Sequence, residues 1–472
     1  MTRPLVFLLA LALAVFAFAS CSFTTAGNFK ECITDVDCGT VAACSSGYCL
    51  PLPTGCRREE AGGMRKAFEE TNRIPLVALL PITGSSGEVD DSEVQSVNGI
   101  KLALSEGNDR LSSERGFFGL FVCNTGAPDA SLAVQGPWFI NNLKVPAMFV
   151  SSSGPTQTMA LDSTRKDAGT LIISPNATNP ELTTVFSNDG NVWRVAPPDN
   201  FQAEVMSRLV QMDLDAGTRV AILAPTTAYG QGFGNPLKEL LTSKGYTAQL
   251  FPYVRDDEQT PTRETAVNGV LNLMPQATVL IGGPADVVFL IERAKLFPQL
   301  TRAMGHRWYL TDSSKDPATI TPTTRSEFES ALGTAPAQGA GLAYPTFRDV
   351  FRTRYGVDPD TTNYVSHSYD AAWLVMLSAQ FAAGTPPDPK KITGPRLAQG
   401  MAKMSLASGP PTQLRADKWA ELANGLSMGT TTNIEGTSGP LDLNLDAGFA
   451  MSPYEVWQVT DGGIRVLRFV TP

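Results

Sequence analysis

Histidine is almost absent from this chain of 472 residues, which contains only His306 and His367. Histidine is a common ligand of zinc and the usual base of a Ser/His/Asp triad, so both kinds of site are disfavoured. Charged residues make up 18% of the chain, which is ordinary for a soluble globular protein of more than one domain, and the formal net charge is −9. A nucleic-acid backbone needs a basic surface, so we expect no nucleic-acid partner. The sequence indicates no metal and no cofactor.

Long apolar runs are missing after the first twenty residues. The longest candidate, residues 371–383, is shorter than the ~20 residues that span a bilayer. It also contains Ser378 and Gln380. This run therefore predicts a buried core helix and not a membrane span.

The N-terminus has the pattern of an export signal. The unbroken apolar run at residues 5–19 follows Arg3 and has the length of a signal-peptide core. Residues 18–21 (FASC) resemble a lipoprotein cleavage box, in which the cysteine becomes the lipidated first residue. We therefore expect a signal peptide at residues 1–20, lipidation at Cys21, and attachment to a membrane through acyl chains on the periplasmic side of the cell envelope. A plain signal peptide cut nearby is the alternative, and the choice of membrane is open.

Cysteine supports an oxidising compartment. Besides Cys21 the chain has Cys32, Cys38, Cys44, Cys49, Cys56 and Cys123. Five of these lie within residues 31–56, which have few large apolar side chains and need crosslinks to hold a shape. Six thiols can pair completely, so we expect a small disulfide knot or stalk ahead of the main domain. Zinc is the rival interpretation, although no C-x-x-C pair is present. Cys123 either pairs with the remaining cysteine of the knot or stays a free buried thiol.

The rest of the chain alternates between strand and helix patterns. Residues 57–73 are rich in charge and glycine and predict a solvated linker. Beyond them, short apolar runs separated by amphipathic helices are typical of parallel α/β sheets. We expect strands at residues 76–80, 120–123, 147–150, 171–173, 220–223, 249–253, 278–281 and 307–310. We also expect helices such as 201–212 and 286–296, and a C-terminal hairpin at 454–467.

Residues 174–183 (SPNATNPELT) form the most informative local pattern. The preceding apolar residues 171–173 predict a buried strand, and Asn179 is a good N-cap for a helix that begins at Pro180. Between strand and helix, the backbone N–H groups and the Thr178 hydroxyl suit a carboxylate or another small polar group. An ordinary strand–helix loop is the alternative.

Related patterns recur in order along the chain. They are residues 74–84 (IPLVALLPITG), 98–103 (NGIKLA), 144–154 (KVPAMFVSSSG), 192–199 (VWRVAPPD), 219–224 (RVAILA), 228–232 (AYGQG) and 368–372 (SYDAA). Together with residues 174–183, they resemble the strands, binding loops and first lobe crossover of the type I periplasmic solute-binding proteins, the branched-chain amino-acid receptor class. No single pattern is diagnostic, but the set spans residues 74–472.

This resemblance implies an α/β fold of two Rossmann-like lobes joined by three crossovers, preceded by a Cys-rich segment at residues 21–73. The first lobe is expected at residues 74–196 plus 338–440, and the second at residues 197–337 plus 441–472. The resemblance also implies a function. An extracytoplasmic solute-binding lipoprotein would close its lobes on a small polar solute, such as an amino acid, and present it to an ABC permease or a sensor protein.

The resemblance also assigns ligand-binding residues on the first lobe. These are Thr83, Ser86, Ser152, Ser153, Asn176 and Thr178. Ser152, with Ser153 beside it, matches a position whose hydroxyl contacts the ligand. Asn176 through its backbone carbonyl, and Thr178 through its N–H and hydroxyl, match the pair that holds the α-amino and α-carboxylate groups. Thr83 and Ser86 are weaker matches in the first loop.

On the second lobe, Tyr229 matches an aromatic residue that closes over the ligand, but two positions depart from the pattern. Amino-acid-binding relatives have a second aromatic residue after the strand at 278–281, where this chain has residues 282–286 (GGPAD). They also have an acidic residue near residues 311–314 (TDSS), where Asp312 either supplies the charge or caps the next turn. The solute is therefore open among an amino acid, a small amide, an organic acid and a peptidoglycan fragment.

Other functions receive less support from the sequence. The S-x-x-K match at residues 163–166 (STRK) lacks both partner motifs of the enzymes that use it, so chance explains it and we expect no enzyme. The alternative function is a non-transport envelope lipoprotein of the same fold, which regulates a cell-wall enzyme or a sensor by protein–protein contact.

Overall fold

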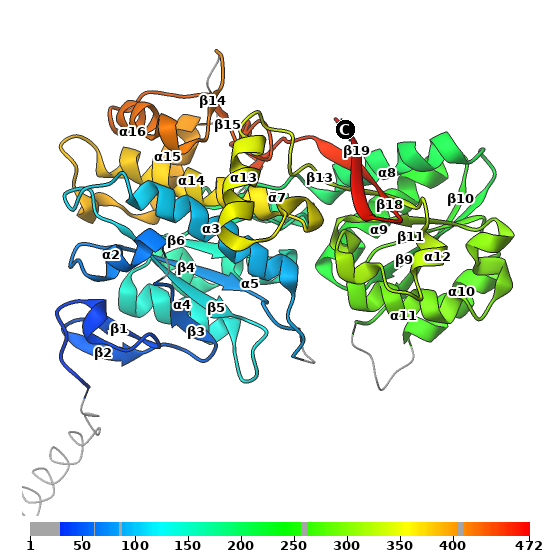
Figure 1. Ribbon diagram of the computed structural model, residues 1–472, viewed down its shortest axis with the longest axis horizontal. Helices are drawn as coiled ribbons and strands as arrows, with labels where there is room; N and C mark the ends of the chain where they lie inside the picture. Colours follow the sequence, from blue (N-terminus) through cyan, green and yellow to red (C-terminus); the bar gives the residue numbers. More distant parts are fainter. Residues whose placement is uncertain (1–28, 61, 85–86, 188, 256–261, 405–408) are drawn as a thin grey trace, which may run out of the picture.

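A computed structural model of the chain describes residues 29–472 apart from residues 61, 85–86, 188, 256–261 and 405–408. The expected signal peptide and the lipidation site Cys21 lie outside the described residues. Two α/β lobes lie side by side along the long axis, and a small N-terminal unit lies against the first lobe (Figure 1). This is the predicted fold class.

The first lobe is built on an eight-stranded sheet with the order β16-β17-β8-β7-β6-β4-β5-β3. Its strands are β3 (Cys56–Arg58), β4 (Ile74–Leu80), β5 (Phe118–Asn124), β6 (Ala147–Val150), β7 (Leu171–Ser174), β8 (Val192–Arg194), β16 (Leu443–Asn444) and β17 (Phe449–Ala450). Strands β4 to β8 are parallel. Their carboxyl ends therefore share one edge of the sheet, where ligands bind in open α/β folds.

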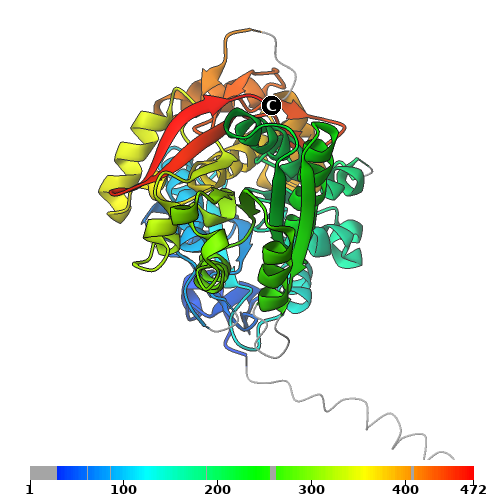
Figure 2. The same ribbon diagram turned by 90° about the vertical axis from the view of Figure 1, so that its right-hand side faces the viewer.

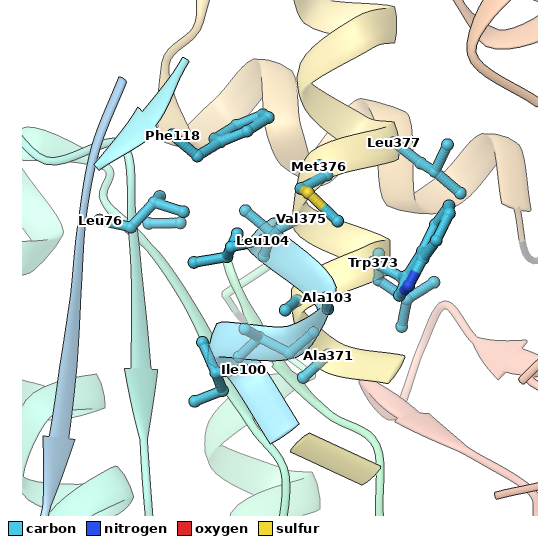
Figure 3. Packing of buried hydrophobic residues seen from close by; sticks show 14 of the residues in the cluster. Leu76, Ile100, Ala103, Leu104, Phe118, Ala371, Trp373, Val375, Met376 and Leu377 are labelled. Atoms are coloured by element: carbon cyan, nitrogen blue, oxygen red, sulfur yellow. The ribbon is translucent and has the colours of Figure 1, made fainter. Parts of the chain in front are cut away.

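Helices cover both faces of this sheet. They are α2 (Arg65–Phe68), α3 (Asp91–Asn108), α4 (Leu132–Leu143), α5 (Ser153–Leu161), α6 (Ser163–Ala168), α7 (Glu181–Phe186), α13 (Tyr344–Tyr355), α14 (Val365–Ala383), α15 (Gly394–Met404) and α16 (Trp419–Ser427). Helices α3 and α14 pack on one face, where Leu104 and Met376 lie beside Leu76 of β4 (Figure 3). Helix α14 is buried along nearly its whole length, as predicted for residues 371–383. No helix in the described part of the chain has the length and apolar character of a membrane span.

The second lobe repeats this plan. Its sheet has the order β10-β9-β11-β12-β13-β18-β19, and its first five strands are parallel. The strands are β9 (Arg219–Pro225), β10 (Thr247–Tyr253), β11 (Ala277–Leu280), β12 (Arg307–Leu310), β13 (Leu332–Pro336), β18 (Tyr454–Thr460) and β19 (Gly463–Val470). The helices are α8 (Asp199–Asp213), α9 (Ala228–Ser243), α10 (Thr262–Leu273), α11 (Pro284–Ala294) and α12 (Arg325–Phe328). Figure 2 shows this lobe from its free side, with the predicted hairpin β18–β19 in red.

Three crossings join the lobes and lie next to one another. They are residues 195–198, 337–343 and 451–453. The Ala337 N–H donates to the Pro453 carbonyl at 2.9 Å, and the Tyr454 hydroxyl donates to the Pro198 carbonyl at 2.7 Å. Strands β16 and β17 belong to the sheet of the first lobe, so the third crossing follows them and not the expected boundary at residue 440. These two-residue strands are too short to produce an apolar run that a sequence pattern would reveal.

The N-terminal unit is a crosslinked hairpin of β1 (Ala42–Ser45) and β2 (Tyr48–Pro51). Three disulfides involve this unit: Cys32–Cys44, Cys38–Cys49 and Cys56–Cys123. The last joins two directly opposed residues of β3 and β5. The predicted disulfide knot is therefore present, Cys123 is bonded to it, and the six sulfurs of the rival zinc interpretation are all in disulfides.

Residues 57–73 are not the solvated linker that their charge and glycine content predicted. Arg58 in β3 is buried and donates to the backbone carbonyl of Asp35. Phe68 in α2 is also buried, with its ring centroid 5.4 Å from that of Phe121 in β5. The prediction failed because the charged groups are paired inside the fold, and composition alone does not reveal pairing. The knot is consequently continuous with the first lobe and is not a separate stalk.

Candidate ligand-binding site between the lobes

The two lobes meet at Asp312, which follows β12 in the second lobe. The Tyr364 hydroxyl, located just before α14 in the first lobe, donates to Asp312 Oδ2 at 2.5 Å. The neighbouring Asn363 donates from Nδ2 to the backbone carbonyl of Asp312. Because these bonds join elements of different sheets, the lobes are in direct contact here.

Asp312 also binds side chains of its own lobe. Its Oδ1 accepts hydrogen bonds from the Tyr229 hydroxyl at 2.7 Å and from Gln202 Nε2 at 3.0 Å. The turn after β12 is closed by Ser314, whose hydroxyl accepts a bond from the Thr311 N–H at 3.1 Å. The Asp312 carboxylate, which accepts bonds from both lobes, therefore lies between them, and its role toward a ligand stays a prediction.

On the first lobe, the loops after β6 and β7 hold one another through side chains. The Ser151 hydroxyl donates to Glu93 Oε1 at 2.5 Å, and Asn176 Nδ2 donates to Ser151 Oγ at 2.8 Å. Asn176 Oδ1 accepts the Ser152 N–H at 2.7 Å. Glu93 comes from the first turn of α3, so three elements converge at this edge of the sheet.

Ser153 and Thr178 connect the same two loops further along. The Ser153 hydroxyl accepts the N–H groups of Thr178 and Asn179, each at 3.1 Å. Asn179 Oδ1 accepts the Glu181 N–H at 3.0 Å, which is the predicted N-cap of α7. The loop at residues 174–183 is therefore rigidly held, and its side chains are used within the first lobe.

Buried carboxylates dominate the electrostatics of this region. Burial and then the nearby Asp312 carboxylate raise the pKa of Asp199 well above its usual value, and burial also raises the pKa of Asp312. Burial raises the pKa of Glu93 to about 8, and the charge of Asp90 adds to this shift. Burial lowers the pKa of Arg194 to about 10. The site therefore holds more acidic than basic groups.

Backbone strain occurs at two residues of this region. Ser152 has a φ of +67° and Tyr364 has a φ of +62°, values that residues other than glycine rarely adopt. Strained residues tend to lie at ligand sites, because the surrounding bonds must hold them in place. Here the Ser152 N–H donates a hydrogen bond to the Asn176 side chain, and the Tyr364 hydroxyl donates one to the Asp312 carboxylate.

We call these residues the interlobe polar cluster. Its members are Glu93, Ser151, Ser152, Asn176, Thr178, Asp199, Gln202, Tyr229, Asp312, Asn363 and Tyr364. It offers hydrogen-bond donors and acceptors from both lobes, which suits binding of a small polar molecule.

No protein-family model matches the chain. The substrate-binding protein BasB of the chemotactic signal transduction system of Halobacterium salinarum is 26% identical over 301 residues, which are 62% of this chain and 65% of that protein. Leu/Ile/Val-binding protein homolog 1 of Brucella abortus is 28% identical over 207 residues, which are 42% of this chain and 50% of that protein. The matched part is thus less than two thirds of each relative.

Solved structures match over nearly their full length. The leucine-binding protein LivK of Thermotoga maritima has a TM-score of 0.67 and 17% identity, covering 84% of this chain and 99% of that one. LivJ of Streptococcus pneumoniae, in complex with isoleucine, has a TM-score of 0.63 and 18% identity, covering 85% of this chain and all of that one. A Rhodopseudomonas palustris solute-binding protein in complex with benzoate has a TM-score of 0.61 and 14% identity, with 85% and 97% covered. The chain has the type I periplasmic binding protein fold. The family resemblance and the fold class expected from the sequence are thereby confirmed.

Within the type I periplasmic binding fold, the expected site residues fall into two groups. The interlobe polar cluster includes Ser152, Asn176, Thr178, Tyr229 and Asp312, and Ser153 bonds to it directly. Thr83 bonds to Asn124 of β5: its hydroxyl accepts from Asn124 Nδ2 at 2.9 Å and its N–H donates to Asn124 Oδ1 at 3.2 Å. Ser86 lies outside the described residues.

Six members of the cluster were not among the expected site residues: Glu93, Ser151, Asp199, Gln202, Asn363 and Tyr364. Glu93 and Asp199 both lie in the first turn of a helix, where an acidic residue is explained by the helix dipole alone. Gln202 is one turn into α8 and Tyr364 precedes α14, and neither belongs to a recognisable motif. The spacing Asp90 to Glu93 resembles a helix cap, and Asp90 does accept the Glu93 N–H at 3.2 Å. Only the buried position of the Glu93 side chain reveals its second role.

Proposed function

We propose that this protein is an extracytoplasmic solute-binding lipoprotein that captures a small polar solute, an amino acid or a related compound, between its lobes for ABC-type uptake or for sensing. The main observation behind this proposal is the interlobe polar cluster, to which both lobes contribute buried polar side chains. The relatives support this proposal, since they are named as solute-binding proteins of transport and chemotaxis and not as enzymes. Lipid anchoring is proposed from the sequence around Cys21.

Asp312→Asn tests the site. The change removes the carboxylate from a residue that both lobes contact, so we expect the affinity for any solute of the site to fall at least tenfold, about 1.4 kcal/mol or more. A thermal-shift panel of amino acids, amides and organic acids identifies a solute, because a ligand of the folded state raises its stability. Calorimetry then compares the variants.

Asp215→Asn is the matched control. Asp215 is exposed and precedes β9, at the amino-terminal edge of the sheet and away from the cluster. Equal affinity in the two variants, or a panel in which no compound shifts the melting temperature, would count against a receptor function.

Cys21→Ser tests the anchor separately. If acyl chains are the one attachment, the variant moves from the membrane fraction to the soluble fraction. Detection of the variant in the membrane pellet after a salt wash would refute lipidation at this position, without bearing on the solute.

A further inference from the structure

Two backbone N–H groups of the first-lobe ligand loops are engaged within the protein. The Thr178 N–H donates to Ser153 Oγ. The Ser152 N–H donates to Asn176 Oδ1. The Thr178 hydroxyl lies beside Asp199, whose carboxylate oxygens form no hydrogen bond with the described residues, and the Ser152 hydroxyl also has no partner there.

The buried side-chain atoms of the cluster that lack a hydrogen-bond partner are acceptor oxygens. Glu93 Oε2, Gln202 Oε1 and Asn363 Oδ1 have no hydrogen-bond partner within the described chain. These side chains are buried, with exposed fractions of 6% for Glu93, 0% for Gln202 and 5% for Asn363. A buried acceptor without a donor costs free energy, so native structures rarely leave one unless a ligand or water completes it. The missing partner must therefore bring donors.

The acidic groups of the cluster lie at two separate positions. Glu93 lies beside Ser151 and Asn176, whereas Asp199 lies beside Thr178 and near the Asp312 carboxylate, which raises the pKa of Asp199 further. Arg194 partly offsets the charge near Asp199, but Glu93 has only another acid, Asp90, as its charged neighbour. A buried carboxylate is costly unless a cation accompanies it. Both positions would gain from a positive group.

We propose that the solute is an organic cation with amino or guanidino groups and no carboxylate, with a diamine as the simplest example. This inference rests on the proposed solute-binding function and names its ligand class. One ammonium donates to Glu93 Oε2, and the second donates toward Asp199 and Asp312. An ammonium has three donors and no acceptor, which complements a cluster whose unsatisfied atoms are oxygens. A zwitterionic amino acid would bring a carboxylate to a surface that already holds several.

Calorimetry on the full chain tests this ligand class with putrescine, cadaverine, agmatine, leucine and benzoate as probes. We expect the diamines to bind at least tenfold more tightly than leucine. Binding of leucine or benzoate without the amines overturns the inference and leaves the solute-binding function in place. Absence of binding by every probe counts against both.

Glu93→Gln tests the proposed contact between Glu93 and the first ammonium group of the solute. Glu106→Gln is its matched control. Glu106 lies on the same helix, is partly buried, and accepts a bond from the Tyr369 hydroxyl at 2.6 Å. We expect Glu93→Gln to weaken putrescine binding at least tenfold and Glu106→Gln to leave it within twofold, with circular dichroism confirming that both variants fold. Unchanged putrescine affinity in Glu93→Gln overturns the inference.

The pH dependence of the unmodified protein provides a second test that needs no variant. The groups that face Glu93 are Asp90 of its own helix, Ser151 after β6 and Asn176 after β7. A cation binds the ionised carboxylate, so its affinity should rise from pH 6 to pH 8 and binding near pH 7 should release a proton. Affinity that falls as the pH rises overturns the inference.

Discussion

Buried carboxylates set the chemistry of this protein at the level of single residues. Asp370 is a buried carboxylate that the fold stabilises with hydrogen bonds. The N–H and hydroxyl groups of Thr437 and Ser438 all donate to it at 2.7 to 3.0 Å. Burial nevertheless raises the pKa of Asp370 to about 6. Glu93 has fewer donors and a pKa near 8, so its ionisation costs more stability.

Glu93→Gln is expected to change how stability depends on pH. An acid whose pKa is raised by folding stabilises the protein below its unfolded value, near 4.5, and this contribution is lost as the pH rises to about 8. The loss amounts to up to about 5 kcal/mol, at about 1.4 kcal/mol for each pKa unit. The ligand-free variant should therefore lose less stability than the unmodified protein between pH 5 and pH 8.

Urea denaturation at several pH values measures this difference. Parallel pH profiles for the two proteins would show that Glu93 does not titrate in this range, while Glu106→Gln reports the effect of a partly buried glutamate outside the cluster.

At this scale, the sequence predicted positions better than roles. Ser152 and Tyr229 were found because they follow recognisable strand and helix starts. The use of Asn176 was different from the expectation, since its side-chain amide, and not its carbonyl alone, organises the loop. Glu93 and Asp199 were missed because burial, which turns an ordinary helix-start acid into a site residue, depends on distant elements.

At the level of elements, the close approach of α3 and α14 determines the core of the first lobe. A Cβ atom at Gly99 would lie 2.6 Å from the Val365 carbonyl oxygen and 3.3 Å from Ser368 Cβ. The nearer atom belongs to the backbone, so it moves only if the helix moves. Glycine at this position lets the start of α14, and with it Tyr364, lie close to the sheet.

Gly99→Ala should therefore lower the free energy of unfolding by about 1 to 3 kcal/mol, the usual cost of overpacking. Gly425→Ala in α16 is the control, because the nearest atom to its added Cβ, Thr430 Cβ, is 3.9 Å away. There the change should raise stability by up to about 1 kcal/mol, since alanine favours a helix. Chemical denaturation followed by circular dichroism compares the two, and a similar effect at both positions would contradict tight helix packing at Gly99.

Elements with long apolar runs were predictable, and short or pairing-dependent ones were not. Strands such as β6 and β12 match their predicted residues, because a buried parallel strand is apolar on both faces. Strand β3 contains two arginines and was assigned to a linker. Its place in the sheet comes from antiparallel pairing with β5, which a local pattern does not contain.

At the level of the whole molecule, the lobes touch through a small number of polar contacts. The bond from Tyr364 to Asp312 crosses between them, and Asn363 reinforces it. The relative position of two rigid lobes depends on side chains more than 50 residues apart in sequence, so no local pattern predicts it. The resemblance to a known family predicted that there are two lobes, but not which residues join them.

Tyr364→Phe should shift the ligand-free protein toward an open arrangement. A hydrogen bond to a carboxylate contributes about 1.5 to 3 kcal/mol, so its loss favours lobe separation by roughly ten- to a hundredfold. Small-angle X-ray scattering should report a larger radius of gyration, with unchanged circular dichroism. Tyr355→Phe is the control, because the Tyr355 hydroxyl lies in the first lobe and bonds to no described residue. Equal radii for both variants would show that the Tyr364 contact does not govern closure.

The disulfide between Cys56 and Cys123 also determines how the molecule carries mechanical load. Tension applied at residue 29 reaches Cys56 through the crosslinked hairpin and then passes directly to β5 through the sulfur–sulfur bond. Residues 57–122, which include β4 and α3, lie outside this covalent path and bear no force while the bond is intact. A protein held by its N-terminal end can thus be pulled without unravelling the strand and the helix that support the ligand loops of the first lobe.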